Sequence, residues 1–193
     1  MGKNDWIEFK RLTEQKFEYA TIEKSWGHQI QRNTKWNTGL NEVEITDLEK
    51  QFGFKFPIDY REMLTVINGF ETLHIAINPD VDAEAEYDRR CYKYPDDLEV
   101  TKWLVDEANQ NMEVVIGVLS DAGFDSSQIE GFIPLYAHRA LVVLKDRQQS
   151  PVLSIWGDDI VLYGQSLIRY WCNEFHIDFG TNALLTSAGK PDL

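Results

Sequence analysis

The sequence of 193 residues contains only two cysteines and no long apolar run. Cys91 and Cys172 lie far apart and share no motif with a histidine, which excludes a CxxC redox site and a zinc cluster of the usual spacing. No segment approaches the roughly 20 apolar residues that span a bilayer, and the chain does not open on an apolar signal segment. We therefore expect a cytoplasmic protein without membrane association, in which both thiols are buried.

The common catalytic and cofactor motifs are absent as well. The sequence has no GxGxxG or GxxxxGK[ST] loop and no HExxH pair, and Ser166 is followed by Leu167 and Ile168 instead of completing a GxSxG elbow. We therefore expect no cofactor, no bound metal and no enzymatic activity.

Positive charge is also scarce, since 19 Lys and Arg residues face 32 Asp and Glu residues, for a net charge of −13. Residues 1–40 contain 5 acidic and 7 basic residues, so residues 41–193 contain 27 acidic and 12 basic residues, a balance of −15. Because this charge repels phosphates, we expect no direct binding to nucleic acid. A basic protein partner is favoured instead, because opposed fields speed encounter.

Apolar residues recur every three or four positions in several segments, which predicts helices. These segments are residues 5–24, 41–53, 57–69, 98–108, 112–121 and a last helix after Gly164, while residues 26–37 form a helical continuation or an ordered connection. Asn41 and Glu44 have the spacing of a capping box, and Gly53 suits the residue that ends this helix. Pro57 fits the start of the next helix, and Asn68-Gly69 its end.

Elsewhere the apolar period changes to two, which predicts strands. Leu73, Ile75 and Ile77 mark a half-buried strand with His74 on its outer face. Four further strands are predicted at residues 132–136, 139–144, 152–156 and 160–163. The Gly157-Asp158-Asp159 break between the last two suits a tight hairpin. Helices combined with a meander of short antiparallel strands indicate an α+β domain with a twisted antiparallel sheet flanked by helices.

One domain accounts for most of the chain. We place it at residues 40–177, with a helical extension at residues 1–39 that packs on it and a polar tail at residues 178–193. Residues 80–99 contain 8 acidic and 3 basic residues, and we expect them to form an exposed, partly ordered loop.

His138 is the histidine best placed for chemistry, because it stands beside Arg139 at the start of a predicted strand. It could act as a general base oriented by a carboxylate of the Asp158-Asp159 turn. A structural role is favoured, because no nucleophile or oxyanion motif accompanies it.

The adjacent carboxylates of Asp158 and Asp159 point in diverging directions, so turn formation explains them better than glycosidase chemistry. The nearby aromatic residues are expected to pack in the core in preference to lining a ligand groove. These are Trp156, Tyr163, Tyr170 and Trp171.

Two ordered sets of residues resemble the SUKH superfamily, which includes the Smi/Knr-type fungal cell-wall regulators. The first set is Leu40, Ile45, Leu48, Glu49, Phe52-Gly53, Phe56-Pro57, Asp59-Tyr60, Leu64 and Asn68-Gly69. The second set is residues 132–139, 152–156, Asp159-Ile160 and Tyr163-Gly164. Ala137 stands where many relatives have glycine before the His-Arg pair, which implies a less tight turn. The resemblance implies a SUKH-like single domain with a non-enzymatic role, since bacterial members are viewed as immunity proteins that neutralise polymorphic toxins.

Charge and resemblance together predict an immunity protein that covers a basic, nuclease- or deaminase-type toxin domain. The residues expected to contact the partner are Asp80, Asp82, Glu84, Glu86, Asp88, Asp96, Asp97, Asp158, Asp159, His138 and Trp156. The alternative is a regulatory or scaffold module that binds a host peptide or a small ligand in an aromatic pocket. A hydrolase centred on His138 is the third and weakest hypothesis.

Overall fold

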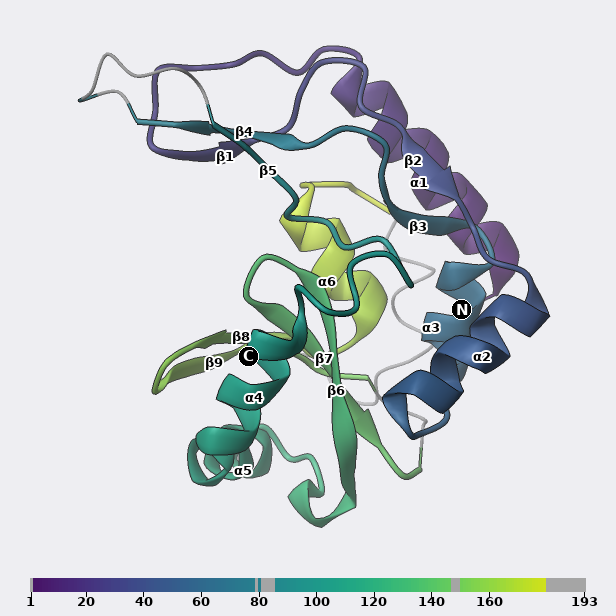
Figure 1. Ribbon diagram of the computed structural model, residues 1–193, viewed down its shortest axis with the longest axis vertical. Coiled ribbons are helices and arrows are strands. Elements are labelled where there is room, and N and C mark those ends of the chain that lie inside the picture. Colours follow the sequence, from purple (N-terminus) through teal and green to yellow (C-terminus); the bar gives the residue numbers. More distant parts are fainter. Residues whose placement is uncertain (1, 79, 81–85, 147–149, 180–193) are drawn as a thin grey trace.

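The computed structural model describes residues 2–78, 80, 86–146 and 150–179, which contain six α-helices and nine β-strands (Figure 1). The elements are α1 (Lys3–Phe17), β1 (Gly27–Gln29), β2 (Trp36–Thr38), α2 (Glu42–Phe52), α3 (Ile58–Leu64), β3 (Ile67–Phe70), β4 (His74–Ile77), β5 (Glu86–Asp88), α4 (Lys102–Gln110), α5 (Met112–Asp121), a short 3-10 helix (Ser126–Gln128), β6 (Ile129–Tyr136), β7 (Arg139–Leu144), β8 (Val152–Trp156), β9 (Asp159–Gly164) and α6 (Leu167–Glu174). All strand pairs are antiparallel, which confirms the predicted α+β class.

The strands of the described residues form three sheets, whereas the sequence predicted one twisted antiparallel sheet. The largest has the order β6-β7-β8-β9, and the two others are β1-β4-β5 and β2-β3. Figure 1 shows the three-stranded sheet at the top of the molecule, apart from the four-stranded sheet. An isolated bridge between Cys91 and Tyr136 connects the chain after β5 to the end of β6.

The four-stranded sheet separates two hydrophobic cores, because successive side chains of a strand point to opposite faces. Val142, Leu153 and Ile160 face the smaller core, which is closed by Leu104 of α4 and Leu119 of α5. The other face contributes to a larger core that also contains side chains from α1, α3 and α6. Its sheet residues are Ile133, Leu135, Leu141, Val143 and Val152.

Aromatic rings dominate the larger core. Trp36, Phe70, Trp171 and Phe175 contact one another at centroid distances between 4.2 and 5.8 Å. Trp6 of α1 is also completely buried there, so the N-terminal helix packs on the rest of the domain through a shared core.

The strongest local signals are confirmed. Asn41 accepts hydrogen bonds from Val43 N and Glu44 N at 2.9 and 3.0 Å, and Glu44 accepts one from Asn41 N at 2.8 Å. Gly53 then ends α2 in the left-handed conformation, with φ of +83°. Both cysteines are free and buried, as expected.

Two predicted helices end earlier than expected, and the helix predicted to begin at residue 98 begins at Lys102. The first ends at Phe17 instead of residue 24, because the chain turns back and Asn33 N donates to Phe17 O at 2.9 Å. Part of the segment predicted as a helix or connection then forms β1. The helix after Pro57 ends at Leu64, and Asn68-Gly69 lies in β3. Here a distant contact decides the structure, because the Asn68 amide pairs with the backbone of Tyr94 at 2.6 and 2.9 Å.

The outward position predicted for His74 is wrong. Its side chain is only 2 % exposed, because its ring packs against Phe70 and Tyr136 and hydrogen-bonds the Tyr136 hydroxyl at 3.0 Å. Ile75 and Ile77 are only half-buried.

Ala137 occupies the β6–β7 turn in a conformation that favours glycine, with φ of +49°. The turn remains tight, since Tyr136 pairs directly with Arg139, so the less tight turn that the resemblance implied is not observed. A residue with a β-carbon at this positive φ raises the free energy of the folded state by roughly 1–2 kcal/mol, and glycine avoids that cost. Part of the gain is offset, because glycine also increases the conformational entropy of the unfolded chain.

We expect Ala137→Gly to raise the free energy of unfolding by up to about 1 kcal/mol, measured by urea denaturation. Gly157→Ala, at φ of +59° in the β8–β9 turn, is the reverse substitution and should destabilise. A stability loss in Ala137→Gly would contradict the account of this turn.

Candidate partner-binding surface

Part of the four-stranded sheet remains uncovered on the face that bears Trp156. Cross-strand pairing places Trp156 opposite Asp159 and Ser154 opposite Val161. Trp156, Val161 and Tyr163 are 65 %, 47 % and 40 % exposed. We call Trp156, Asp158, Asp159, Val161 and Tyr163 the hairpin face; Figure 1 shows the β8–β9 hairpin reaching out from the body.

The hairpin tip is held in place by the fold. Gly157 adopts φ of +59° and donates its N–H to Glu107 Oε1 of α4 at 2.8 Å. This bond anchors the two-residue turn to α4 and leaves the Asp158 and Asp159 side chains exposed. The predicted tight hairpin is confirmed, and its acidic tip points into solvent.

His138 supports the exposed indole from the neighbouring turn. Its ring meets the Trp156 ring edge-on at a centroid distance of 5.6 Å. The Arg139 guanidinium contacts His138 Nε2 and lies 4.2 Å from the centre of the Tyr163 ring. Burial, and next the Arg139 charge, lower the pKa of His138 to about 4, so the ring is neutral at pH 7.

The hypothesis of a general base oriented by a carboxylate is therefore not supported. A guanidinium, and not a carboxylate of the Asp158-Asp159 turn, occupies His138 Nε2. This arrangement fixes the ring beside Trp156. The charge of Asp159 raises the pKa of His138, but burial and the charges of Arg139 and Arg90 outweigh it.

The acidic residues of segment 80–99 are used differently from one another. Asp82 and Glu84 lie outside the described residues, and Asp80 and Glu86 are exposed. Three acidic residues of this segment form ion pairs with its own bases: Asp88 with Arg90 at 2.9 Å, Asp96 with Lys93 at 2.7 Å, and Asp97 with Arg89 at 3.2 Å. Their charge is thereby partly neutralised.

The exposed loop predicted for residues 80–99 is wrong for residues 91–94 and for Asp97, whereas Pro95 and Asp96 are exposed as predicted. Cys91, Tyr92 and Tyr94 are buried, and the Tyr94 hydroxyl donates to Pro134 O at 2.8 Å. Asp97 is only 8 % exposed and accepts Lys93 N at 2.7 Å. It therefore has a role in holding this segment.

The structure thus brings together His138, Trp156, Asp158 and Asp159 and leaves the other described candidates elsewhere. Trp156 and Tyr163 are exposed, so the expectation of core packing is wrong for them, whereas it holds for Tyr170 and Trp171. Val161 was not predicted as a site residue, although it belongs to the alternating pattern of β9. The sequence pattern does not indicate which of the two faces of β9 remains exposed.

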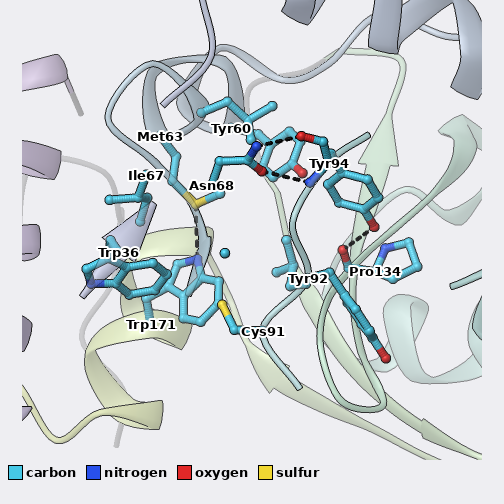
Figure 2. A pocket seen from close by; sticks show the side chains of 13 residues that line it. Trp36, Tyr60, Met63, Ile67, Asn68, Cys91, Tyr92, Tyr94, Pro134 and Trp171 are labelled. Carbon is cyan, nitrogen blue, oxygen red and sulfur yellow. Dashed lines mark hydrogen bonds between the residues drawn. The ribbon is translucent and has the colours of Figure 1, made fainter. Parts of the chain in front are cut away.

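A small internal cavity lies between α3, β3 and α6 (Figure 2). Its volume of about 10 Å³ is room for roughly one water molecule. Two polar groups on its wall have partners in the fold: Asn68 binds the Tyr94 backbone, and Trp171 Nε1 lies 3.2 Å from Met63 Sδ. Burial raises the pKa of the Cys91 thiol, which keeps this wall residue neutral.

Other kinds of site find no support in the described part of the chain. These residues contain no group of three or more His, Cys, Asp or Glu side chains that could hold a metal ion. None of the helices described is both long enough and apolar enough to cross a membrane.

Burial of His74 has a consequence for acid stability. Burial, and next the charges of His28 and Arg90, lower its pKa from 6.5 to about 4. The unfolded state therefore binds a proton more readily, and stability is lost as the pH falls from about 6.5 to about 4. A shift of this size corresponds to about 3 kcal/mol.

We expect His74→Phe to flatten the dependence of unfolding free energy on pH between about 6.5 and 4, by up to about 1.4 kcal/mol per pH unit. At pH 7 the variant should be less stable by about 1–2 kcal/mol, because the Tyr136 hydroxyl loses its partner. Urea titrations across this range measure both effects. Parallel pH profiles for the variant and the wild type would show that His74 is not the group responsible.

No protein-family model matches the chain, and no curated protein matches it either. The hairpin face is therefore the main basis on which a function can be inferred.

Proposed function

We propose that this protein acts without catalysis, by binding a basic protein partner through the hairpin face. The observation that carries the proposal is the exposed indole of Trp156, which is 65 % accessible and shares an uncovered part of the sheet with the exposed Val161 and Tyr163. Tryptophan and tyrosine supply a disproportionate share of the energy of protein interfaces. His138 and Arg139 hold this aromatic surface in position before any partner arrives.

Charge indicates what kind of partner this surface suits. Asp158 and Asp159 extend from the tip, Glu107 stands behind them, and the whole chain carries −13. Such a field accelerates association with a positively charged protein and repels nucleic acid. Acidic rims around an aromatic centre select partners with lysine or arginine near an apolar patch.

Within this class we propose an immunity protein that neutralises a nuclease- or deaminase-type toxin in the cytoplasm. The residues that resemble the SUKH superfamily support this choice, as does the acidity, because a nucleic-acid-processing domain presents a basic substrate surface. An acidic protein bound over that surface blocks access of the phosphate backbone.

Affinity capture tests the proposal. The tagged chain is incubated with lysate of its source organism, and captured proteins are identified and purified for direct binding assays. We expect a basic partner that binds wild type and Trp26→Ala equally but binds Trp156→Ala weakly. Trp26 is 63 % exposed and lies outside the hairpin face, so it is a matched control.

The purified partner is then expressed with and without this chain in a host. Loss of growth in its absence, and rescue by wild type but not by Trp156→Ala, is the expected result for an immunity protein. Equal rescue by both would contradict a role for the hairpin face.

A further inference from the structure

The two edges of the four-stranded sheet are protected to very different degrees. The edge strands are β6 and β9. β6 contains Pro134 and two register irregularities, and the segment after β5 covers its end through the Cys91–Tyr136 bridge and a hydrogen bond from Tyr92 N to Leu135 O at 3.2 Å. These are devices by which proteins prevent a further strand from joining a sheet.

β9 has almost none of these devices. Its sequence DIVLYG contains no proline and no lysine, and its one register irregularity lies toward Gly164. No strand of the described residues pairs with its outer edge. Ile160 N donates locally to Asp158 O at 3.1 Å, and the rest of this six-residue edge forms no ladder with another described strand. Such an edge is a template for an added strand.

We infer that the partner contributes an extended, lysine- or arginine-bearing segment that adds as a fifth strand along β9, an inference that rests on the proposed function. Every second residue of β9, namely Asp159, Val161 and Tyr163, lies on its exposed face. These side chains therefore contact every second side chain of an added strand. The residue beside Asp159 is then cationic and reaches the Trp156 indole, and the next on that face is apolar.

Charge favours this occupant over a second copy of the chain. Two copies, each of charge −13, repel one another, whereas a basic segment is attracted to the same edge. Main-chain hydrogen bonds supply affinity in this mode of binding, and the alternate side chains supply specificity.

The probe is the palindromic peptide acetyl-Lys-Thr-Val-Thr-Lys-amide, added to the ¹⁵N-labelled full chain. It places lysine beside Asp159 in either direction and valine beside Val161. We expect weak binding, with a Kd on the order of 1 mM, and NMR shifts concentrated on the amides of residues 159–164 and the Trp156 indole. A peptide with glutamate in place of lysine should not bind, and Asp159→Asn should weaken binding roughly threefold to tenfold.

Two N-methylated peptides separate strand addition from side-chain docking. One is methylated on both threonine amides and the other on the valine amide. In an added strand only one of these two sets of N–H groups points toward β9 and can form hydrogen bonds with it. We expect one peptide to lose at least about tenfold in affinity and the other to retain it. Equal binding by both, or shifts that map elsewhere or do not occur at 5 mM ligand (roughly five times the expected Kd), would overturn the inference.

Two further results separate this inference from the proposed function. If the captured partner needs Trp156 but the peptide does not bind β9, the strand addition fails and the proposed function stands. If sedimentation shows a dimer of the chain that Val161→Lys dissociates, the edge is occupied by a second copy and the inference is wrong.

Discussion

Trp156→Ala is expected to weaken binding of the partner at least ~30-fold, about 2 kcal/mol of binding free energy. The indole is exposed, yet its position is fixed by the His138 ring 5.6 Å away, so little side-chain entropy is lost when a partner covers it. Removing it also removes the largest apolar surface at the centre of the hairpin face. Isothermal titration of the purified partner measures the effect.

The loss should lie mainly in the dissociation rate, because the acidic residues that steer encounter remain. Asp158→Asn, by comparison, should mainly lower the association rate and its dependence on salt. Trp26→Ala should match wild type. Loss of affinity in Trp26→Ala with none in Trp156→Ala would place the interface on another surface.

Glu49→Ala is expected to produce the largest loss of stability among the substitutions considered, about 3 kcal/mol. The Glu49 side chain is only 2 % exposed and joins two helices and the loop between them. Its carboxylate accepts from Arg61 Nη1 at 2.5 Å, Lys55 Nζ at 2.7 Å and Phe56 N at 3.0 Å. Burial alone would raise the pKa of this carboxyl, but these hydrogen bonds outweigh it and lower the pKa.

Alanine at position 49 leaves the Phe56 N–H without its acceptor in a buried position, which explains the size of the expected loss. Asp47→Ala is the matched control on the same helix, because the Asp47–Lys50 pair is exposed and should contribute less than about 1 kcal/mol. Denaturant titrations of both variants check the prediction. A cost for Glu49→Ala no larger than for Asp47→Ala would contradict the account. Under conditions in which Glu49→Ala is folded, its affinity for the partner should equal that of the wild type.

Elements fixed by short-range chemistry were predictable from the sequence. The capping box of Asn41 and Glu44 and the left-handed Gly53 define α2 without help from the rest of the chain. The β8–β9 hairpin likewise follows from its turn residues, with Gly157 at positive φ.

Errors arose where distant residues decide the outcome. Asn68-Gly69 has the composition of a helix end, but the Asn68 amide binds Tyr94, 26 residues further along, and the segment becomes a strand. His74 is buried against the sequence pattern because Tyr136, 62 residues away, supplies a hydrogen-bond partner. No local period encodes such contacts.

The candidate site was predictable only in part. Its acidic tip and aromatic residues are close in sequence, so Trp156, Asp158 and Asp159 could be named. Which side chains remain exposed depends on how far α6 and the larger core extend over the sheet, and the sequence does not specify that extent. For the same reason Val161 was missed. Asp97 was named although it is buried, because its contacts with Lys93 N and Arg89 have no signal in the sequence pattern.

Oxidative footprinting of tryptophan in the purified complex tests most directly whether the molecule works by contact through its β8–β9 hairpin. Three of the six tryptophans, Trp6, Trp36 and Trp171, are buried, whereas Trp26, Trp103 and Trp156 are exposed. The account predicts that hydroxyl radicals modify these last three in the free chain and that the partner protects Trp156 alone. Undiminished oxidation of Trp156 in the complex, with protection of Trp26 or Trp103 instead, would contradict it.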